Sequence, residues 1–186
     1  MLLVYVVIAS VLIGYITGGR LRNYSNKPFR KVLLPVFAFF IEAMIGPLDQ
    51  LLHIPTAQWL GWLVLLEYIM LFIFLIYNYR YRGIELLALS TVTNFAVIAA
   101  NDYRMPVSPV IFKYPELMHF VERIQNGSLP EYTLVDYDGP LWYLGDTIPM
   151  FGGLASMGDL IMAMAVMVIV LTFMHAKPAE KIAPLD

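Results

Sequence analysis

The chain has 186 residues, of which 60% are hydrophobic and only 14% are charged, and its mean hydropathy is +0.70. This composition excludes an ordinary soluble domain and favours a protein embedded in a membrane. The absence of cysteine excludes disulfides, thiolate catalysis, cysteine-ligated zinc and iron–sulfur clusters.

Five apolar stretches run along the chain and are separated by polar segments. An apolar helix needs roughly 20 residues to cross about 30 Å of hydrocarbon, so flanking aromatic and polar residues must complete the shorter stretches. The sequence therefore predicts an all-α fold, a single membrane domain of five transmembrane helices. The predicted spans are Leu2–Thr17, Val32–Ile45, Trp59–Tyr77, Ile84–Ala100 and Asp159–Met174.

The cations fall mostly on one side of these spans. Nine of the twelve lysines and arginines lie between spans one and two, between spans three and four, or after span five. The positive-inside rule assigns that side to the cytoplasm, so we expect the N-terminus outside and the C-terminus in the cytoplasm. The nine cations are Arg20, Arg22, Lys27, Arg30, Lys31, Arg80, Arg82, Lys177 and Lys181.

Residues 101–158 form one long segment that the charge pattern places outside the cytoplasm, and we expect them to form a cap of helix and loop. Within this segment, Pro115–Gln125 has apolar side chains at helical spacing and a proline at the first helical position. We expect this helix to cap the bundle or to lie in the headgroup plane. Its stripe residues Leu117, Phe120 and Ile124, together with Trp142, are the candidates for binding a ligand or partner.

Two acids and an amide lie inside the predicted spans. No lysine or arginine within a span neutralises Glu42 and Glu67, and intramembrane acids are hypotheses for function. Asn94 and neighbouring hydroxyl side chains favour a central position for the fourth span. Two interpretations stay open: a proton or cation path through these three residues, or a polar pin in which the acids hydrogen-bond to Asn94 or Thr91.

The start of the last span also has two interpretations. Ser156 followed by Asp159 approximates a capping box, with aspartate in the place usually held by glutamate or glutamine, and this explains both residues as a helix start. The alternative joins Asp159 to Asp102 and Asp146 at the outer surface. Two carboxylates that share a site divide into an acid and a base, which can activate water.

The motifs Asn101-Asp102-Tyr103-Arg104 and Ser156-x-Gly158-Asp159 loosely resemble those of lipoprotein signal peptidase. That family places one aspartate at the outer end of its third span and one at the start of its fourth. The chain differs in having five predicted spans and in lacking the family's Asn-x-x-Asp form. The resemblance implies a membrane-embedded aspartic peptidase, with Asp102 and Asp159 at the matching positions. With Asp146 from the carboxylate interpretation, these are the catalytic candidates for a hydrolase.

No metal and no cofactor is expected from the residue spacing. The histidines at positions 53, 119 and 175 are scattered, and they form no His-x-x-x-His pattern. The basic inner loops suit anionic lipid headgroups, so we expect membrane lipids as partners and no nucleic acid.

Several short motifs follow one another along the chain: Gly18-Gly19-Arg20-Leu21, Asn94, Asn101, Met105-Pro106-Val107, Leu144-Gly145-Asp146-Thr147-Ile148-Pro149 and Ser156-x-Gly158-Asp159-Leu160. In this order they resemble an uncharacterised family of bacterial multi-span membrane proteins, a domain of unknown function. The resemblance implies a helical bundle in the bacterial cytoplasmic membrane and brings no activity. The family has glycine where Asp102 stands, which leaves Asp146 and Asp159 as the more family-like acids.

Three functions follow from these patterns. The leading hypothesis is a non-enzymatic membrane component that binds a lipophilic ligand or a partner subunit on its outer face. The second is a hydrolase that depends on Asp146 and Asp159. The third is a proton-coupled carrier that depends on Glu42, Glu67 or Asn94.

Overall fold

The computed structural model describes residues 2–26, 29–52, 56–137, 139–150 and 153–176, over which the chain is mostly helical. Lys27, His53, Asp138, Lys177 and Lys181 lie outside the described residues. The α-helices are α1 (Leu2–Ile16), α2 (Leu33–Leu52), α3 (Thr56–Asn78), α4 (Ile84–Ala100), α5 (Met118–Gln125) and α6 (Met157–Met174).

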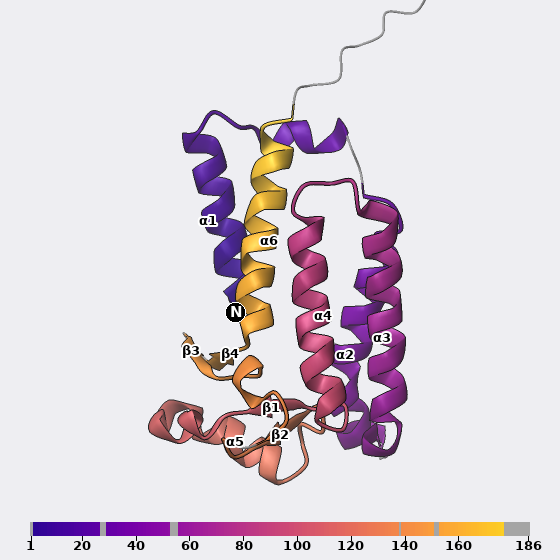
Figure 1. Cartoon of the computed structure of the whole chain (residues 1–186), viewed down its shortest axis with the longest axis vertical. Helices are drawn as coiled ribbons and strands as arrows, with labels where there is room; N and C mark the ends of the chain where they lie inside the picture. Colours follow the sequence, from indigo (N-terminus) through magenta and orange to yellow (C-terminus); the bar gives the residue numbers. More distant parts are fainter. Residues whose placement is uncertain (1, 27–28, 53–55, 138, 151–152, 177–186) are drawn as a thin grey trace, which may run out of the picture.

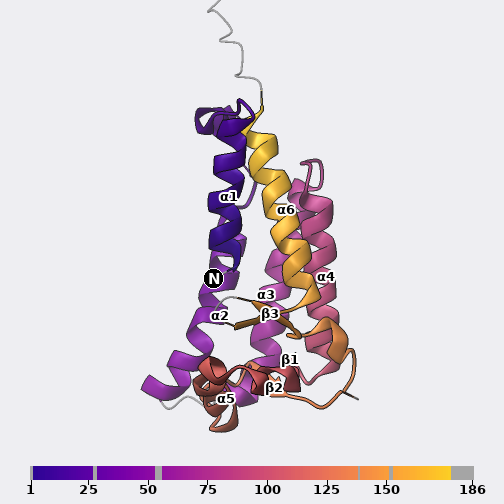
Figure 2. The same cartoon turned by 90° about the vertical axis from the view of Figure 1, so that its left-hand side faces the viewer.

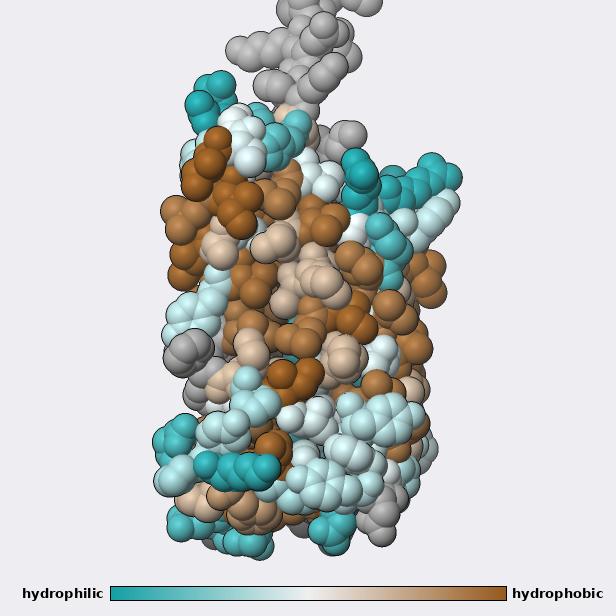
Figure 3. All heavy atoms as spheres, turned by 60° about the vertical axis from the view of Figure 1, so that its left-hand side comes forward, coloured by the Kyte–Doolittle hydropathy of each residue, from teal (hydrophilic) through white to brown (hydrophobic). Residues whose placement is uncertain are grey.

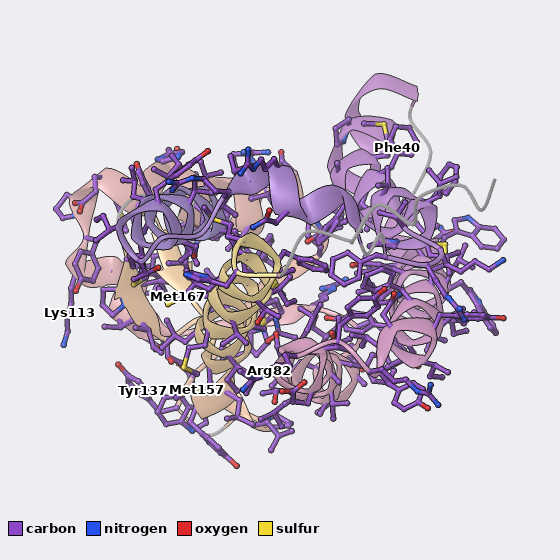
Figure 4. All side chains as sticks on the ribbon, turned by 90° about the horizontal axis from the view of Figure 1, so that it is seen from above. Phe40, Arg82, Lys113, Tyr137, Met157 and Met167 are labelled. Atoms are coloured by element: carbon purple, nitrogen blue, oxygen red, sulfur yellow. The ribbon has the colours of Figure 1, made fainter. Side chains whose placement is uncertain are left out.

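The long helices lie side by side (Figure 1), and seen from above they form an arc (Figure 4). Close packing joins α2 to α3, α3 to α4, α4 to α6 and α6 to α1. Seen from above, α6 lies between α1 and α4, and the 3-10 helix η1 (Leu21–Asn26) runs across this end of the bundle (Figure 4). Helix α4 is therefore the middle helix of the arc, the position that its polar side chains predict.

Helix α2 continues through Gly46 and Pro47 to Leu52, which corrects the predicted span end at Ile45. A proline removes one backbone hydrogen bond and can bend a helix without ending it. A Cβ on Gly46 would lie 3.3 Å from the carbonyl oxygen of Ser128, so the cap packs tightly against α2 here. The cap therefore contacts α2 at the residue that precedes the proline.

Apolar side chains cover the middle of the bundle. A space-filling view shows a hydrophobic band with hydrophilic groups gathered at both ends (Figure 3). Trp62 is 71% exposed and Ile76 is 68% exposed. By length and composition, two of the described helices are able to cross a membrane, over Gln58–Asn78 and Met157–Met174. The apolar helices over Leu2–Ile16, Leu33–Pro47 and Ile84–Ala100 are shorter.

The two ends of the bundle carry different charges. Helices α1, α3 and α6 end, and α2 and α4 begin, at the end that η1 crosses (Figure 1). The cations in these connections therefore gather at one end, and the segment after α4 lies at the other. The described cations at the η1 end are Arg20, Arg22, Arg30, Lys31, Arg80 and Arg82.

The cap, residues 101–156, lies across the opposite end (Figure 2) and contains short strands, which corrects the purely α-helical expectation. Strand β1 (Met105–Val107) pairs in parallel with β2 (Tyr132–Leu134), and β3 (Ile148–Met150) pairs antiparallel with β4 (Gly153–Ala155). Three-residue strands are too short to show the alternating pattern that predicts a strand. The remaining elements of the cap are α5, η2 (Pro109–Lys113), η3 (Pro115–Leu117) and η4 (Trp142–Leu144).

The apolar stripe of the predicted cap helix packs into the cap itself. The segment is helical as expected, with η3 followed by α5. Leu117 is 5% exposed, and the Phe120 ring lies 5.1 Å from the ring of Tyr132 in an edge-to-face contact. The stripe therefore packs largely within the cap, and a position of this helix in the headgroup plane stays a prediction. The buried core beneath it is formed by Val107, Ile111, Leu117 and Val121, with Ile124 packed against them.

Helices α4 and α6 meet at a glycine. The hydroxyl of Ser90 donates a 2.8 Å hydrogen bond to the carbonyl oxygen of Gly158. A Cβ at Gly158 would overlap the side-chain amide of Asn94. Small residues at helix contacts let two backbones approach closely, and here only glycine leaves room for the Asn94 amide.

We expect Gly158→Ala to lower the free energy of unfolding by about 1–3 kcal/mol, because the methyl group must displace Asn94 or separate the helices. Gly153→Ala is the matched control, since a Cβ there meets nothing within 4 Å. We expect the control to change stability by less than about 0.5 kcal/mol. Denaturant unfolding of the detergent-purified protein measures both, and equal effects would contradict the close contact.

Candidate functional site

A cavity of about 530 Å³ lies inside the arc of helices and reaches the cap. Its wall comes from α2, α3, α4, α6 and the cap, with Leu3 contributed by α1. Toward the η1 end the wall is apolar, and it includes Pro35, Phe74, Leu87 and Val166. The volume falls within the range of about 300–1,000 Å³ that is typical of small-molecule sites.

The part of the cavity nearer the cap is acidic. Its carboxylates come from α2, α3, α6 and two separate parts of the cap, so the fold brings together residues that are far apart in the sequence. No lysine, arginine or histidine is among the described residues that line this cavity. The carboxylates are those of Glu42, Glu67, Glu131, Asp146 and Asp159.

Asn94 links α4 to the first turn of α6. Its Oδ1 accepts a 2.9 Å hydrogen bond from the hydroxyl of Ser156, and its Nδ2 donates a 3.2 Å hydrogen bond to Oδ1 of Asp159. Oδ2 of Asp159 accepts from the backbone amide of Ser156, and the Asp159 amide donates to the Ser156 hydroxyl, each at 3.0 Å. The predicted capping box is confirmed. Asp159 therefore serves as a cap and also lines the cavity.

Asp146 is held in the cap by its backbone. Its amide donates to the carbonyl oxygen of Pro106 at 2.9 Å, and its own carbonyl accepts from the amide of Ser108 at 3.0 Å. The residue is only 8% exposed, and within the described chain its carboxylate has no hydrogen-bond partner. Burial, and then the charge of Asp159, raise the pKa of Asp146 to about 8. Asp146 therefore holds a proton at neutral pH.

Glu42 and Glu67 both face the cavity, but they do not form the expected hydrogen bonds to α4. The Thr91 hydroxyl donates to the carbonyl of Leu87 in its own helix, and the Asn94 amide is bound to Ser156 and Asp159. Glu67 is 8% exposed, whereas Glu42 remains exposed on the α2 side. Among the described residues, the expected hydrogen bonds from these acids to Asn94 or Thr91 are therefore not formed.

Glu131 and Tyr132 also line the cavity, and sequence reasoning did not identify them. The parallel pairing of β1 with β2 places them there, since Met105 pairs with Tyr132 and the Met105 amide donates to the carbonyl of Glu131. Burial raises the pKa of the Glu131 carboxyl, and burial also raises the pKa of the Tyr132 hydroxyl. The acidic composition of the cap was the available signal, but it does not single out one residue.

Two other sequence candidates lie outside the cavity. Asp102 is exposed in the turn after α4, with a φ of +54°, and it does not line the cavity with Asp146 and Asp159. Trp142 packs its ring against Tyr137 at 5.0 Å and against Tyr143 at 6.2 Å. The structure therefore brings together two of the three aspartates, and it separates Trp142 from them.

The chemistry available at this site is that of carboxylates. Over the described residues, no group of three or more histidine, cysteine, aspartate or glutamate side chains has the geometry to hold a metal ion. A cavity with several acids and no neutralising cation can bind a positively charged group or hold protons.

A model of a family of unknown function, DUF5317, matches residues 26–171. The chain belongs to DUF5317. The DUF5317 match extends from the end of η1 into the second half of α6, and it therefore includes all five carboxylates of the cavity. No curated protein and no solved structure matches the chain significantly. Because the function of DUF5317 is unknown, membership of the family does not indicate an activity, and a function must be argued from the site.

The raised pKa of Asp146 predicts a dependence of stability on pH. Between its ordinary value of 3.8 and its folded value of about 8, the folded protein holds a proton that the unfolded chain releases. Stability contributed by this group therefore falls as pH rises from about 4 to about 8. Asp159 is the charged group that acts on it, and Tyr132 is the titratable neighbour on β2.

We expect Asp146→Asn to raise the midpoint of thermal unfolding at pH 8, by roughly 2–4 °C for each kcal/mol gained, and to change it little at pH 4. Differential scanning fluorimetry across this range measures the effect. Asp136→Asn, at an exposed position of the cap, is the control and should keep the wild-type slope. A variant slope equal to that of the wild type would show that Asp146 titrates normally.

Proposed function

We propose that the chain is an integral membrane protein with five transmembrane helices, its cap outside the cytoplasm and its basic end inside. The apolar band visible on one face of the bundle (Figure 3) and the exposed side chains of Trp62 and Ile76 support this proposal, because apolar surface is more favourable in lipid than in water. The gathering of cations at the η1 end supports the orientation. The C-terminus then lies in the cytoplasm and the N-terminus outside.

The orientation has a direct test because the chain has no cysteine of its own. Tyr137 in the cap and Arg82 at the basic end, both marked in Figure 4, are exposed positions for single cysteines. We expect a membrane-impermeant maleimide to label Tyr137→Cys in intact cells, and to label Arg82→Cys only after permeabilisation. The reverse pattern would invert the topology, and labelling of both in intact cells would contradict the span assignment.

We propose further that the protein binds a lipophilic ligand in the cavity inside the arc. The observation that carries this proposal is the cavity itself, about 530 Å³ in volume, with an apolar part toward the η1 end and an acidic part toward the cap. A ligand site is mostly apolar and holds a few polar groups that orient the ligand. Phe39 lines the cavity and is 50% exposed, which supports access from the α2 side.

The structure favours a ligand over a partner subunit bound to the cap helix. A partner would need Leu117, Phe120 and Ile124 on the surface, whereas Leu117 is buried in the cap core and Phe120 and Ile124 are partly buried against it. The outer face of the bundle remains apolar, and a partner within the membrane stays an open prediction. A proton-coupled carrier through Glu42 and Glu67 likewise stays a prediction.

A membrane hydrolase is the second candidate, and one observation favours it. Asp146 holds a proton at neutral pH and lines the same cavity as Asp159, whose carboxylate accepts hydrogen bonds from Asn94 and Ser156. An acid and a base with different environments form the pair that hydrolysis needs. We place this candidate second because both oxygens of Asp159 are already engaged in linking and capping helices.

Native mass spectrometry of the protein, extracted gently from its own membrane, tests ligand binding. We expect the wild type to retain a lipid-like mass. Leu71→Trp should lose that mass, because Leu71 lines the cavity and indole would fill it. Ile73→Trp is the matched control, since Ile73 lies on the same helix with 38% of its surface exposed, and this variant should keep the mass.

Two results would contradict the proposed cavity site. One is a wild-type protein that carries no retained mass, and the other is equal retention by Leu71→Trp and Ile73→Trp. A stoichiometric second protein in place of a small mass would instead favour the partner-subunit hypothesis.

A further inference from the structure

The charge of the cavity wall identifies the class of ligand that it suits. Acidic side chains from α2, α3, α6 and two parts of the cap face one space, and no described residue of that wall carries a positive charge. A lipophilic ligand with an anionic head would add a negative charge to this group. A neutral head would leave the carboxylates as they are, whereas a cation would be attracted by them.

Two of these acids are buried and lack a partner. Asp146 and Glu67 are each 8% exposed, both line the cavity, and neither has a hydrogen-bond partner among the described residues. Burying a charged carboxylate without a partner is costly, and Asp146 accordingly holds a proton at neutral pH. A positively charged group among these side chains would stabilise their charged forms, so its binding would release that proton.

A cation of the cap acts on one of the cavity acids from outside the cavity wall. Arg123 lines an adjoining pocket of about 380 Å³ together with Glu42 and Glu131, outside the wall of the main cavity. Its guanidinium acts to lower the pKa of Glu131, but burial outweighs that effect and the pKa stays raised. Asp146 and Glu67 thus remain without a compensating charge inside the cavity.

Aromatic rings complete the surroundings of the acids. Tyr68, Tyr103 and Tyr132 line the cavity beside the carboxylates. The faces of aromatic rings attract ammonium groups, including those without hydrogen-bond donors. The apolar part, with Leu71, Phe74 and other residues toward the η1 end, suits a hydrocarbon chain.

We propose that the ligand is a lipophilic organic cation, an amine or a quaternary ammonium compound whose charged head lies among the carboxylates and whose apolar part lies toward the η1 end. This inference rests on the proposed function, since it names the chemical class of the ligand in the same cavity. A small metal ion is a poorer match, because the described acids form no metal-binding group.

Three compounds with the same twelve-carbon chain separate charge from hydrophobicity: dodecylamine, 1-dodecanol and dodecanoate. The protein is titrated with each at neutral pH in a maltoside detergent, and the adducts are quantified by native mass spectrometry. We expect dodecylamine to bind about tenfold more tightly than 1-dodecanol, and dodecanoate to bind most weakly.

Variants connect that preference to the two buried acids. Asp146→Asn combined with Glu67→Gln should reduce dodecylamine affinity about tenfold and leave 1-dodecanol affinity unchanged. Each single variant should give part of the loss, so the comparison does not depend on the double variant folding. Glu122→Gln is the matched control, because Glu122 is exposed on α5 and does not line the cavity.

The outcomes separate this inference from the proposed function. Equal binding of the three compounds, or tightest binding of dodecanoate, would overturn the cationic assignment and leave a lipophilic site in place. An amine preference that survives in the double variant would also overturn the assignment. If none of the compounds binds and the native extract carries no retained mass, both the proposed function and this inference fail.

Discussion

The side-chain amide of Asn94 is the contact on which the rest of the arrangement depends. It accepts a hydrogen bond from Ser156, donates one to Asp159, and occupies the space that the missing Cβ of Gly158 leaves. In an apolar bundle, interhelical hydrogen bonds and close contacts at small residues stabilise helix packing. The same amide fixes the first turn of α6. One interaction therefore sets the packing of α4 against α6 and the position of a carboxylate in the cavity wall.

The cavity next to this contact is lined by five carboxyl side chains and by no described lysine, arginine or histidine. Asp146 and Glu67 are buried without partners in the described chain, although hydrogen bonds or cations would stabilise their charged forms. Buried acids that have no partner and face a cavity are candidates for a functional site, whereas structural acids are usually paired. The apolar wall and the acids together form a site that suits an amphiphilic ligand. The same features explain why a binding protein for a lipophilic cation accounts for more of the structure than a hydrolase does.

Local patterns predicted the helices, and contacts distant in sequence determined the site. Hydropathy and helical spacing indicated all the long helices, and the capping box of Ser156 and Asp159 was visible because its residues are three positions apart. The position of Glu131 depends on a three-residue parallel pairing between β1 and β2, for which the sequence has no short-range signal. Asp102 was predicted as a catalytic candidate, but the turn after α4 leaves it exposed and outside the cavity wall. The order of the motifs indicated an uncharacterised family, and the DUF5317 match confirms it.

A crystal structure of the protein grown from a lipidic mesophase, with no ligand added, tests the central claim most directly. Our account predicts elongated electron density inside the arc of helices, with one end within hydrogen-bond distance of Asp146 or Glu67 and the other among the apolar residues toward η1. A cavity that contains only ordered water, or one that is closed by the side chains of α2 and α3, would contradict the account.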